Sequence, residues 1–214
     1  MGLSIKVRSL AAAFAVLLGI AGFANSEPME GVDYALLDPP VILPGPQVQV
    51  AEFFHYGCEA CYRLEPLLTP WLAGLPDDVL FLKVPALRRR DWIPLTRLFF
   101  ALDSLGELKR LNGEVFSAIH DRKINLGDST RAIEWAADNG IDRAAFSAAL
   151  DSKDIDLRVQ RARDLTEVFG IQDTPSIVVD GRYLTSAAMV GNMNALLPVV
   201  DGLIAKARAL RAKQ

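Results

Sequence analysis

The chain contains two cysteines, Cys58 and Cys61, in the sequence Cys-Glu-Ala-Cys. Two thiols at this spacing can form a disulfide with each other and exchange it with the thiols of another protein. A strand-like apolar segment precedes the pair, and leucines at helical spacing follow it. Cys58 therefore falls at the N-terminus of a predicted helix, where free backbone N–H groups and the helix dipole stabilise a thiolate. The pattern predicts a redox-active pair with Cys58 as the exposed, reactive thiol and Cys61 as the buried, resolving thiol.

Other uses of a Cys-x-x-Cys pair fit this sequence less well. A structural disulfide across so short a loop contributes only about 2 kcal/mol, against about 4.7 for a loop of roughly 100 residues. A zinc site needs about four ligands, and besides the thiols the chain offers only His55 and His120, so zinc stays a minor alternative. Covalent haem attachment requires a histidine after the second cysteine, where this chain has Tyr62. We expect no metal and no organic cofactor, only the Cys58–Cys61 disulfide.

The segments around the cysteines predict an α/β fold. Residues 47–54 form an apolar run typical of a buried strand, and residues 79–84 form a second strand after the helix. Residues 176–179 and 182–184 flank Asp180-Gly181, which is the strongest hairpin signal in the chain. A last amphipathic helix carries apolar residues from Leu196 to Leu210 on one stripe.

The middle of the chain has a different character, because Ala, Leu, Arg and Glu dominate and β-branched runs disappear. Helices are expected there at 94–105, 107–121, 129–139, 143–150 and 154–169. The order of elements predicts an α/β fold split by an all-helical insertion.

Composition and the N-terminus limit the class of protein. The 214 residues are 51% apolar and 23% charged, and the net charge of −3 gives no reason to expect a nucleic acid partner. Lys6 and Arg8 precede an apolar run over residues 10–20, followed by small residues up to Ala24. Because this run is shorter than the roughly 18–20 residues of a spanning helix, residues 1–24 are predicted to be a signal peptide cleaved near Ala24. The product is expected where disulfides persist, which in a bacterium is the periplasm.

Three segments together resemble the DsbA family of periplasmic thiol:disulfide interchange proteins. They are Glu52–Tyr62 (EFFHYGCEACY), Gly170–Ser176 (GIQDTPS) and Val179–Tyr183 (VDGRY), in this order along the chain. The resemblance implies a thioredoxin fold interrupted by a helical domain. We expect a discontinuous thioredoxin domain at 25–88 and 171–214, with the helical insertion at 89–170.

The resemblance also implies roles for residues outside the cysteine pair. Pro175 is expected to form a cis peptide bond and face the dithiol, with the backbone of Thr174 pairing with an extended substrate. Glu52 is either an exposed acid at a strand end or, as the resemblance implies, a buried acid that accepts or relays the proton of Cys61.

The residues between the cysteines depart from the family pattern. Many members have a histidine there, whereas this chain has Glu59 and Ala60. At an assumed separation of about 7 Å, a glutamate charge opposes the thiolate by roughly one pKa unit, which predicts a weaker oxidant than relatives with the histidine. His55, three residues before Cys58, either replaces part of the missing positive charge or has no electrostatic role.

These observations favour a periplasmic oxidoreductase that introduces disulfides into reduced exported proteins. The resemblance implies reoxidation by a quinone-linked inner-membrane partner of the DsbB type, and we expect the protein to be a monomer. Two alternatives remain: a disulfide reductase or isomerase, and a peptide-binding chaperone with little redox turnover. The redox equilibrium and the pH dependence of thiolate absorbance separate the three.

Overall fold

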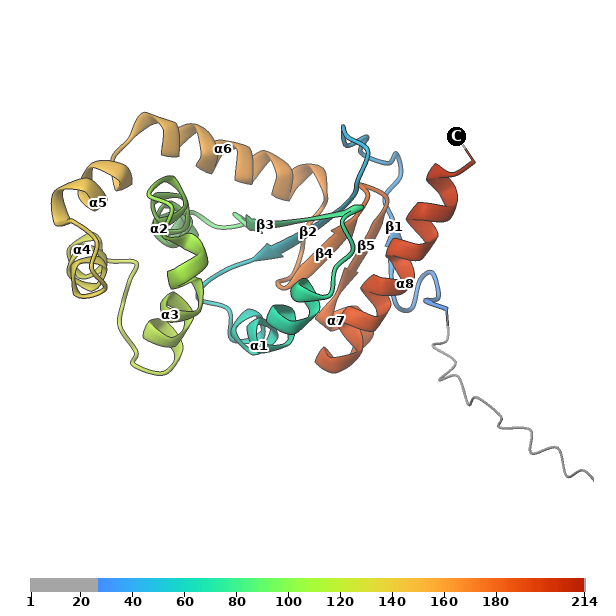
Figure 1. Cartoon of the computed structure of the whole chain (residues 1–214), viewed down its shortest axis with the longest axis horizontal. Helices are drawn as coiled ribbons and strands as arrows, with labels where there is room; N and C mark the ends of the chain where they lie inside the picture. Colours follow the sequence, from blue (N-terminus) through green and yellow to red (C-terminus); the bar gives the residue numbers. More distant parts are fainter. Residues whose placement is uncertain (1–26, 214) are drawn as a thin grey trace, which may run out of the picture.

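The computed structural model describes residues 27–213, so the predicted signal peptide lies outside the described residues. Figure 1 shows a central β-sheet beside a group of helices, with further helices packed against the sheet. Among the described helices, none has both the length and the apolar character needed to span a membrane.

The sheet has five strands in the order β1-β5-β4-β2-β3. Their bounds are β1 Ala35–Leu36, β2 Val48–Phe54, β3 Val79–Pro85, β4 Ser176–Val179 and β5 Tyr183–Ser186. The central strand β2 pairs parallel with β3 and antiparallel with β4, and all seven of its residues are buried. The sequence predicted a strand covered on both faces because the segment is mostly apolar, and the structure buries its two polar residues, Gln49 and Glu52, as well.

The predicted hairpin joins β4 to β5. Asp180 and Gly181 both have positive φ, and the N–H of Arg182 donates to the carbonyl of Val179 over 3.0 Å. Asp-Gly suits this tight turn because glycine adopts positive φ without a steric cost and aspartate tolerates it.

The helices agree with the sequence pattern to within a few residues, except for one short helix before the last. Helix α1 spans Glu59–Ala73, and α2 to α6 span Ile93–Ser104, Leu108–His120, Ser129–Asp138, Arg143–Leu150 and Lys153–Val168. A short α7, Ala187–Val190, was not predicted, and the predicted last helix is α8, Met193–Arg211. The side chain of Asn192 caps α8 by accepting from the N–H of Asn194, which fixes the start of this helix.

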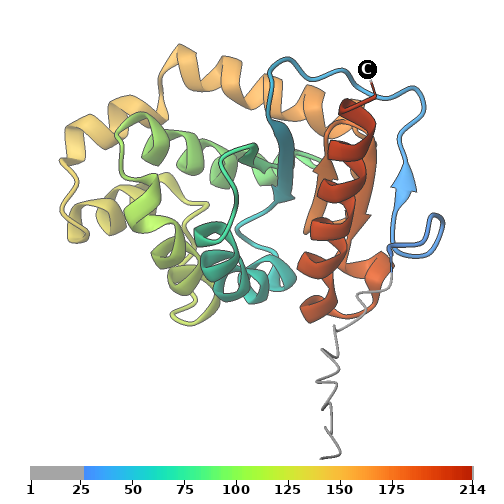
Figure 2. The same ribbon diagram turned by 45° about the vertical axis from the view of Figure 1, so that its right-hand side comes forward.

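The two faces of the sheet are covered differently. Helices α1 and α8 cover one face, where Val48 and Val50 of β2 share a core with apolar residues of both helices. On the other face, Ala51 and Phe53 pack with Phe169 and Ile171 near the end of α6. In Figure 2 the segment between β1 and β2 passes over the end of α8, where Arg211 donates to the carbonyl oxygens of Gly45 and Pro46 over 3.1 and 3.0 Å.

The helices α2 to α6 have a core of their own that extends to the cysteine pair. Phe54 and Tyr56 at the end of β2 belong to this core, together with Cys61. Phe54, for example, lies edge-on to Phe99 of α2 with ring centroids 5.4 Å apart. The helical part therefore buries the inner side of the cysteine pair.

Candidate active site

Cys58 caps the N-terminus of α1 with its sulfur. Its backbone is extended (φ −90°, ψ 117°), and its Sγ accepts a hydrogen bond from the N–H of Cys61 at 3.4 Å. The cap position is normally taken by an oxygen-bearing side chain, so the sulfur replaces an oxygen as acceptor here. Cys58 is partly exposed and Cys61 is fully buried, and both are free thiols. The structure therefore shows the predicted exposure of Cys58 and the predicted burial of Cys61.

The surroundings of the two sulfurs separate their acidities. Hydrogen bonding by Cys61 outweighs burial and, with further hydrogen bonds from Thr174 and the backbone, lowers the pKa of Cys58 to about 5. Burial raises the pKa of Cys61 far above its ordinary value, and the neighbouring Cys58 and Glu52 raise it further. At neutral pH Cys58 is therefore a thiolate and Cys61 a thiol.

The loop before β4 brings Thr174 and Pro175 to the reactive sulfur. The Thr174–Pro175 peptide bond is cis, as the resemblance implied. In the thiol form, Cys58 donates a hydrogen bond to the carbonyl oxygen of Thr174 at 3.2 Å. Beside it lies a pocket of about 580 Å³ whose lining includes Ala60 and Arg63 of α1, Thr174, Pro175 and residues of α7. Thr174, Pro175 and Ala60 are thus brought together next to the thiolate.

Glu52 is a buried acid and not an exposed strand-end residue. It lies opposite Lys83 in the register of β2 and β3, and its side chain is 0% exposed. Lys83 Nζ lies 3.2 Å from Glu52 Oε2, but outside hydrogen-bond geometry, so neither carboxyl oxygen is hydrogen-bonded within residues 27–213. Burial raises the pKa of Glu52 to about 7, although the positive charge of Lys83 opposes the shift.

A polar chain leads from Glu52 towards the helical part and was missed at the sequence level. Lys83 also forms an ion pair with Glu65 of α1. Glu65 Oε2 accepts from Asn112 Nδ2 at 2.7 Å, and Asn112 Oδ1 accepts from the hydroxyl of Tyr56 at 2.9 Å. The only sign of this chain in the sequence was Lys83, a charged residue inside the apolar strand 79–84. Its partners are distant in the sequence and could not be identified from it.

Because Glu52 is buried, its ionisation is expected to lower the free energy of unfolding in a pH-dependent way. Because the folded pKa is above the ordinary value of 4.5, folding takes up a proton and the free energy of unfolding falls as pH rises from about 4.5 to 7. Glu52→Gln removes the charge, so we expect it to stabilise the protein by about 1–3 kcal/mol at pH 8, with little gain at pH 4. Urea unfolding at both pH values measures the difference.

Glu167→Gln is the matched control for this prediction. It removes the same charge from an exposed position of α6, where a carboxylate stays solvated. It should leave the pH dependence of unfolding unchanged. An equal gain from Glu52→Gln at pH 4 and pH 8 would show that the buried charge is not the cause.

His55 does not supply the positive charge that the sequence allowed for it. Its ring stacks on Trp92, with centroids 4.1 Å apart and an interplanar angle of 4°. Burial lowers the pKa of His55 to about 4, so the imidazole is neutral at pH 7. The stacking and the lowered pKa favour the alternative weighed from the sequence, a loop histidine without an electrostatic role.

Glu59 is exposed, but its carboxylate has a partner that the sequence did not reveal. Its Oε2 lies 3.1 Å from Nδ1 of His120, the last residue of α3. The other ring nitrogen of His120 lies 2.7 Å from the carbonyl oxygen of Tyr56. The expectation of a weaker oxidant treated Glu59 as an isolated charge, whereas the structure places the ring of His120 against its carboxylate.

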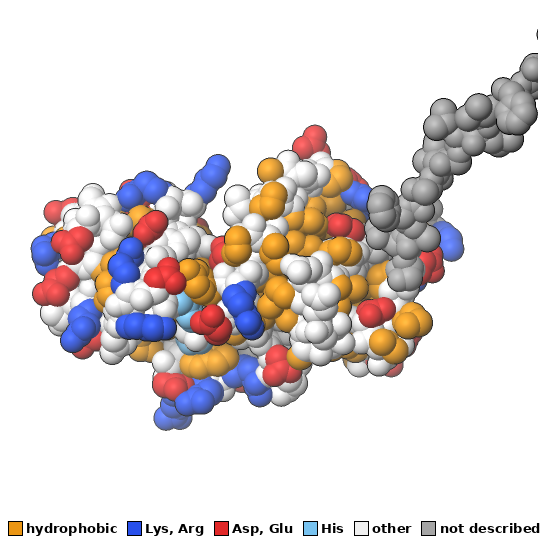
Figure 3. Space-filling view, turned by 90° about the horizontal axis from the view of Figure 1, so that it is seen from below, with side chains coloured by type: hydrophobic (Ala, Val, Ile, Leu, Met, Phe, Trp, Pro, Cys, Tyr) orange, Lys and Arg blue, Asp and Glu red, His pale blue; other side chains and the backbone are white. Residues whose placement is uncertain are grey.

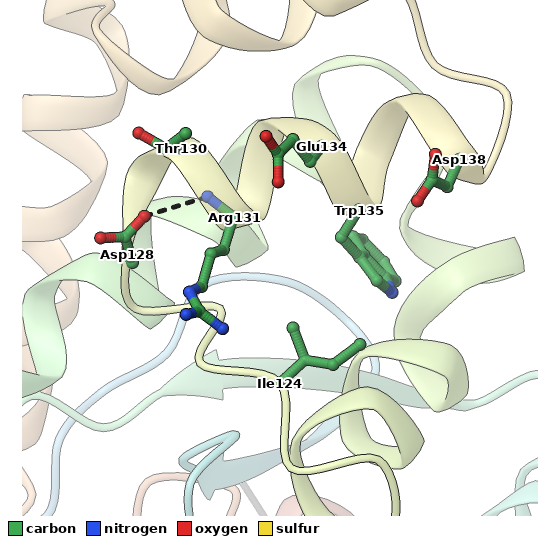
Figure 4. A pocket seen from close by; sticks show the side chains of 7 residues that line it. All are labelled: Ile124, Asp128, Thr130, Arg131, Glu134, Trp135 and Asp138. Atoms are coloured by element: carbon green, nitrogen blue, oxygen red, sulfur yellow. Dashed lines mark hydrogen bonds between the residues drawn. The ribbon is translucent and has the colours of Figure 1, made fainter.

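Other pockets lie away from the two thiols. The pocket in Figure 4, of about 450 Å³, is lined mainly by residues of α4 with Ile124, and none of the predicted site residues contributes to it. Within the described part of the chain, no three His, Cys, Asp or Glu side chains are grouped closely enough to hold a metal ion.

The fold and the site together define a thiol:disulfide oxidoreductase of the thioredoxin class. A family model described as "DSBA-like thioredoxin domain" matches residues 78–196. The "Thiol:disulfide interchange protein DsbA" of Bordetella parapertussis is 38% identical over 199 residues, covering 92% of this chain and 95% of that protein. The chain belongs to the DsbA family.

Solved structures show the same relationship. The crystal structure of Pseudomonas aeruginosa DsbA aligns with a TM-score of 0.81 and 32% identity, covering 86% of this chain and 96% of that one. The oxidoreductase DsbA from Xylella fastidiosa aligns with a TM-score of 0.80 and 28% identity, covering 86% and 100%. The predicted thioredoxin fold with inserted helices is therefore confirmed.

Proposed function

We propose that this oxidoreductase works as an oxidase that introduces disulfides into reduced proteins exported to the periplasm. The observation that carries the proposal is the contrast between the sulfurs, a partly exposed Cys58 with a pKa of about 5 and a buried Cys61 with a raised pKa. A stabilised Cys58 thiolate favours the reduced pair, so the disulfide is a good electron acceptor. At pH 7 a pKa of about 5 in place of the ordinary value makes the potential more oxidising by up to roughly 60 mV.

The reaction needs two thiol–disulfide exchanges. A client thiolate attacks Cys58 Sγ of the disulfide, the bond to Cys61 breaks, and Cys61 leaves with the electron pair and takes up a proton. A second client thiolate attacks the client sulfur of the mixed disulfide, which releases Cys58 as a thiolate. The client loses two electrons to the Cys58–Cys61 pair, and no organic cofactor or metal takes part.

Glu52 is proposed to relay the proton to and from Cys61. Its pKa of about 7 allows both protonation states near neutral pH, and its charge acts on Cys61. An acid of that pKa can donate to the leaving thiolate and recover the proton when the pair is reoxidised. Lys83, beside it, keeps an ionised Glu52 from being an unpaired buried charge.

The surface around Cys58 suits an extended client chain. Thr174 presents its backbone beside the sulfur, and the pocket next to it can receive a client side chain. In Figure 3, which shows the molecule from below, apolar side chains gather over the sheet half, whereas charged ones of both signs cover the helical half. We assign client docking to the sheet half, because an unfolded client exposes the apolar side chains that its folded state buries.

Three further parts of the proposal come from the sequence and from the family. Residues 1–24 direct export, and the protein acts as a monomer. Residues 25–88 and 171–214 form the thioredoxin domain, and residues 89–170 form the helical domain. A membrane oxidase of the DsbB type, linked to quinone, reoxidises the pair.

The redox equilibrium of the purified protein with glutathione tests the proposal. We expect the pair to be much more oxidising than glutathione and to oxidise a reduced client rapidly. A pair as reducing as glutathione, with reshuffling of wrong disulfides, would indicate an isomerase. Client binding without dithiol oxidation would indicate a chaperone. Either of the last two results contradicts the oxidase proposal.

A further inference from the structure

His120 joins the helical part of the molecule to the start of α1. It ends α3, and its side chain is only 8% exposed although its partner Glu59 is 64% exposed. The ring stacks on Tyr62 of α1, with centroids 4.9 Å apart and planes within 5°. Both ring nitrogens are then engaged, Nδ1 by Glu59 Oε2 at 3.1 Å and Nε2 by the Tyr56 carbonyl at 2.7 Å.

Both partners of the ring are hydrogen-bond acceptors when Glu59 is ionised. A backbone carbonyl only accepts hydrogen bonds, and so does an ionised carboxylate. A neutral imidazole has one N–H and could satisfy only one of the two contacts, leaving a lone pair facing an oxygen. Both contacts are favourable together only when His120 is an imidazolium with a proton on each nitrogen.

The groups around the ring support this state. Besides Glu59, Asp121 acts on His120 electrostatically, and its carboxylate accepts from the hydroxyl of Tyr62 at 2.7 Å. Lys123 and the neutral His55 are the further titratable neighbours, Lys123 through its effect on Asp121 and His55 through its coupling to His120. Glu59 thus contacts the ring and Asp121 acts on it electrostatically, whereas Lys123 is linked to it only through Asp121.

We infer that His120 is a positioning residue for dithiol exchange: its imidazolium pairs with Glu59 and cancels the negative charge that this residue would otherwise place next to the Cys58 thiolate. The inference rests on the proposed function, since it concerns how the Cys58 thiolate is kept stable. It means that the helical part contributes a charge to the active site across its contact with α1. A substitution at His120 should therefore act on Cys58 only through Glu59.

Thiolate absorbance of the reduced full-length protein, followed against pH, tests this coupling. His120→Gln leaves Glu59 uncompensated, so we expect the pKa of Cys58 to rise by about one unit, roughly a tenfold change in the thiol–thiolate equilibrium. Glu59→Gln removes both the charge and the reason for the second proton on His120, so we expect little change. The Glu59→Gln/His120→Gln double variant should return to the wild-type titration.

Two controls separate charge from packing. His120→Phe keeps an aromatic ring on Tyr62 without a charge. It should raise the pKa of Cys58 by as much as His120→Gln does. Glu114→Gln removes an exposed acid from the same helix and should have no effect. Should the His120 variants fold poorly, nitrogen NMR of wild-type His120 still decides, because the inference requires protons on both ring nitrogens at pH 7.

Three results would overturn the inference. The pKa of Cys58 could be unchanged in His120→Gln, the substitution at His120 could shift that pKa equally with and without Glu59, or the His120 ring could be neutral at pH 7. Each can occur while wild-type Cys58 still titrates near pH 5, which leaves the proposed oxidase intact. A wild-type Cys58 with an ordinary thiol pKa is a different outcome, because it contradicts the proposed function and this inference with it.

Discussion

A Cys58→Ala variant should lose thiol:disulfide exchange completely, whereas a Cys61→Ala variant should become a trap for its partners. Cys58 is the sulfur that is partly exposed and ionised at neutral pH, so without it no nucleophile reaches a partner disulfide. Without Cys61 the thiolate still attacks a disulfide of a client or of the reoxidising enzyme. The mixed disulfide then persists, because the resolving thiol is missing.

Covalent complexes isolated from cells without reductant measure this difference. The Cys61→Ala protein should form several complexes that disappear on reduction, with clients and the membrane oxidase among them. The matched control is the Cys58→Ala/Cys61→Ala double variant, which should form none. If Cys58→Ala trapped as many partners as Cys61→Ala, the assignment of the two sulfurs would be reversed.

The stability of the reduced protein should rise with pH relative to that of the oxidised protein. The pKa of Cys58 is about 5 in the folded reduced state and has an ordinary value near 8.5–9 when the chain is unfolded. A depressed folded pKa contributes stability that is complete above the unfolded value and is lost as pH falls through about 5. In the oxidised protein neither sulfur titrates, so the contribution of the disulfide itself does not vary with pH.

We expect the difference in free energy of unfolding, reduced minus oxidised, to increase by about 2 kcal/mol between pH 5 and pH 8. This value is roughly half of the full linkage energy, because the sulfur is partly exposed and its interactions are screened by solvent. For a domain of this size it corresponds to about 4–8 °C in melting temperature. Urea unfolding of both redox forms at the two pH values gives the measurement.

The difference between redox forms isolates Cys58 from other titrating groups. Glu52 has a pKa of about 7 in the reduced protein and is present in both forms. The effect of its ionisation on the free energy of unfolding therefore largely cancels in the difference between the two forms. Reduced Cys58→Ala is the control and should not gain stability, relative to the oxidised wild type, as pH rises. Parallel curves for the reduced and oxidised wild-type protein would show that the thiolate is not specially stabilised, which would also contradict the oxidising potential.

Local sequence patterns predicted the parts of this protein that depend on neighbouring residues. The cap position of Cys58 follows from a strand, a turn and a helix in succession, and the Asp180-Gly181 turn follows from two residues. The helices between β3 and β4 follow from the spacing of their apolar residues. Such features are stabilised within a few residues, so their signal is present in a single segment.

Tertiary structure alone decided which charges meet at the site. Glu52 is paired by the register of β2 with β3, His120 reaches Glu59 because α3 packs on α1, and His55 is neutral because it is buried against Trp92. The histidine that contacts Glu59 thus lies 61 residues from it in the chain, whereas the histidine nearest to Cys58 in sequence carries no charge. Electrostatic energy depends on distance and burial in space, and neither quantity is encoded in the spacing of residues along the chain.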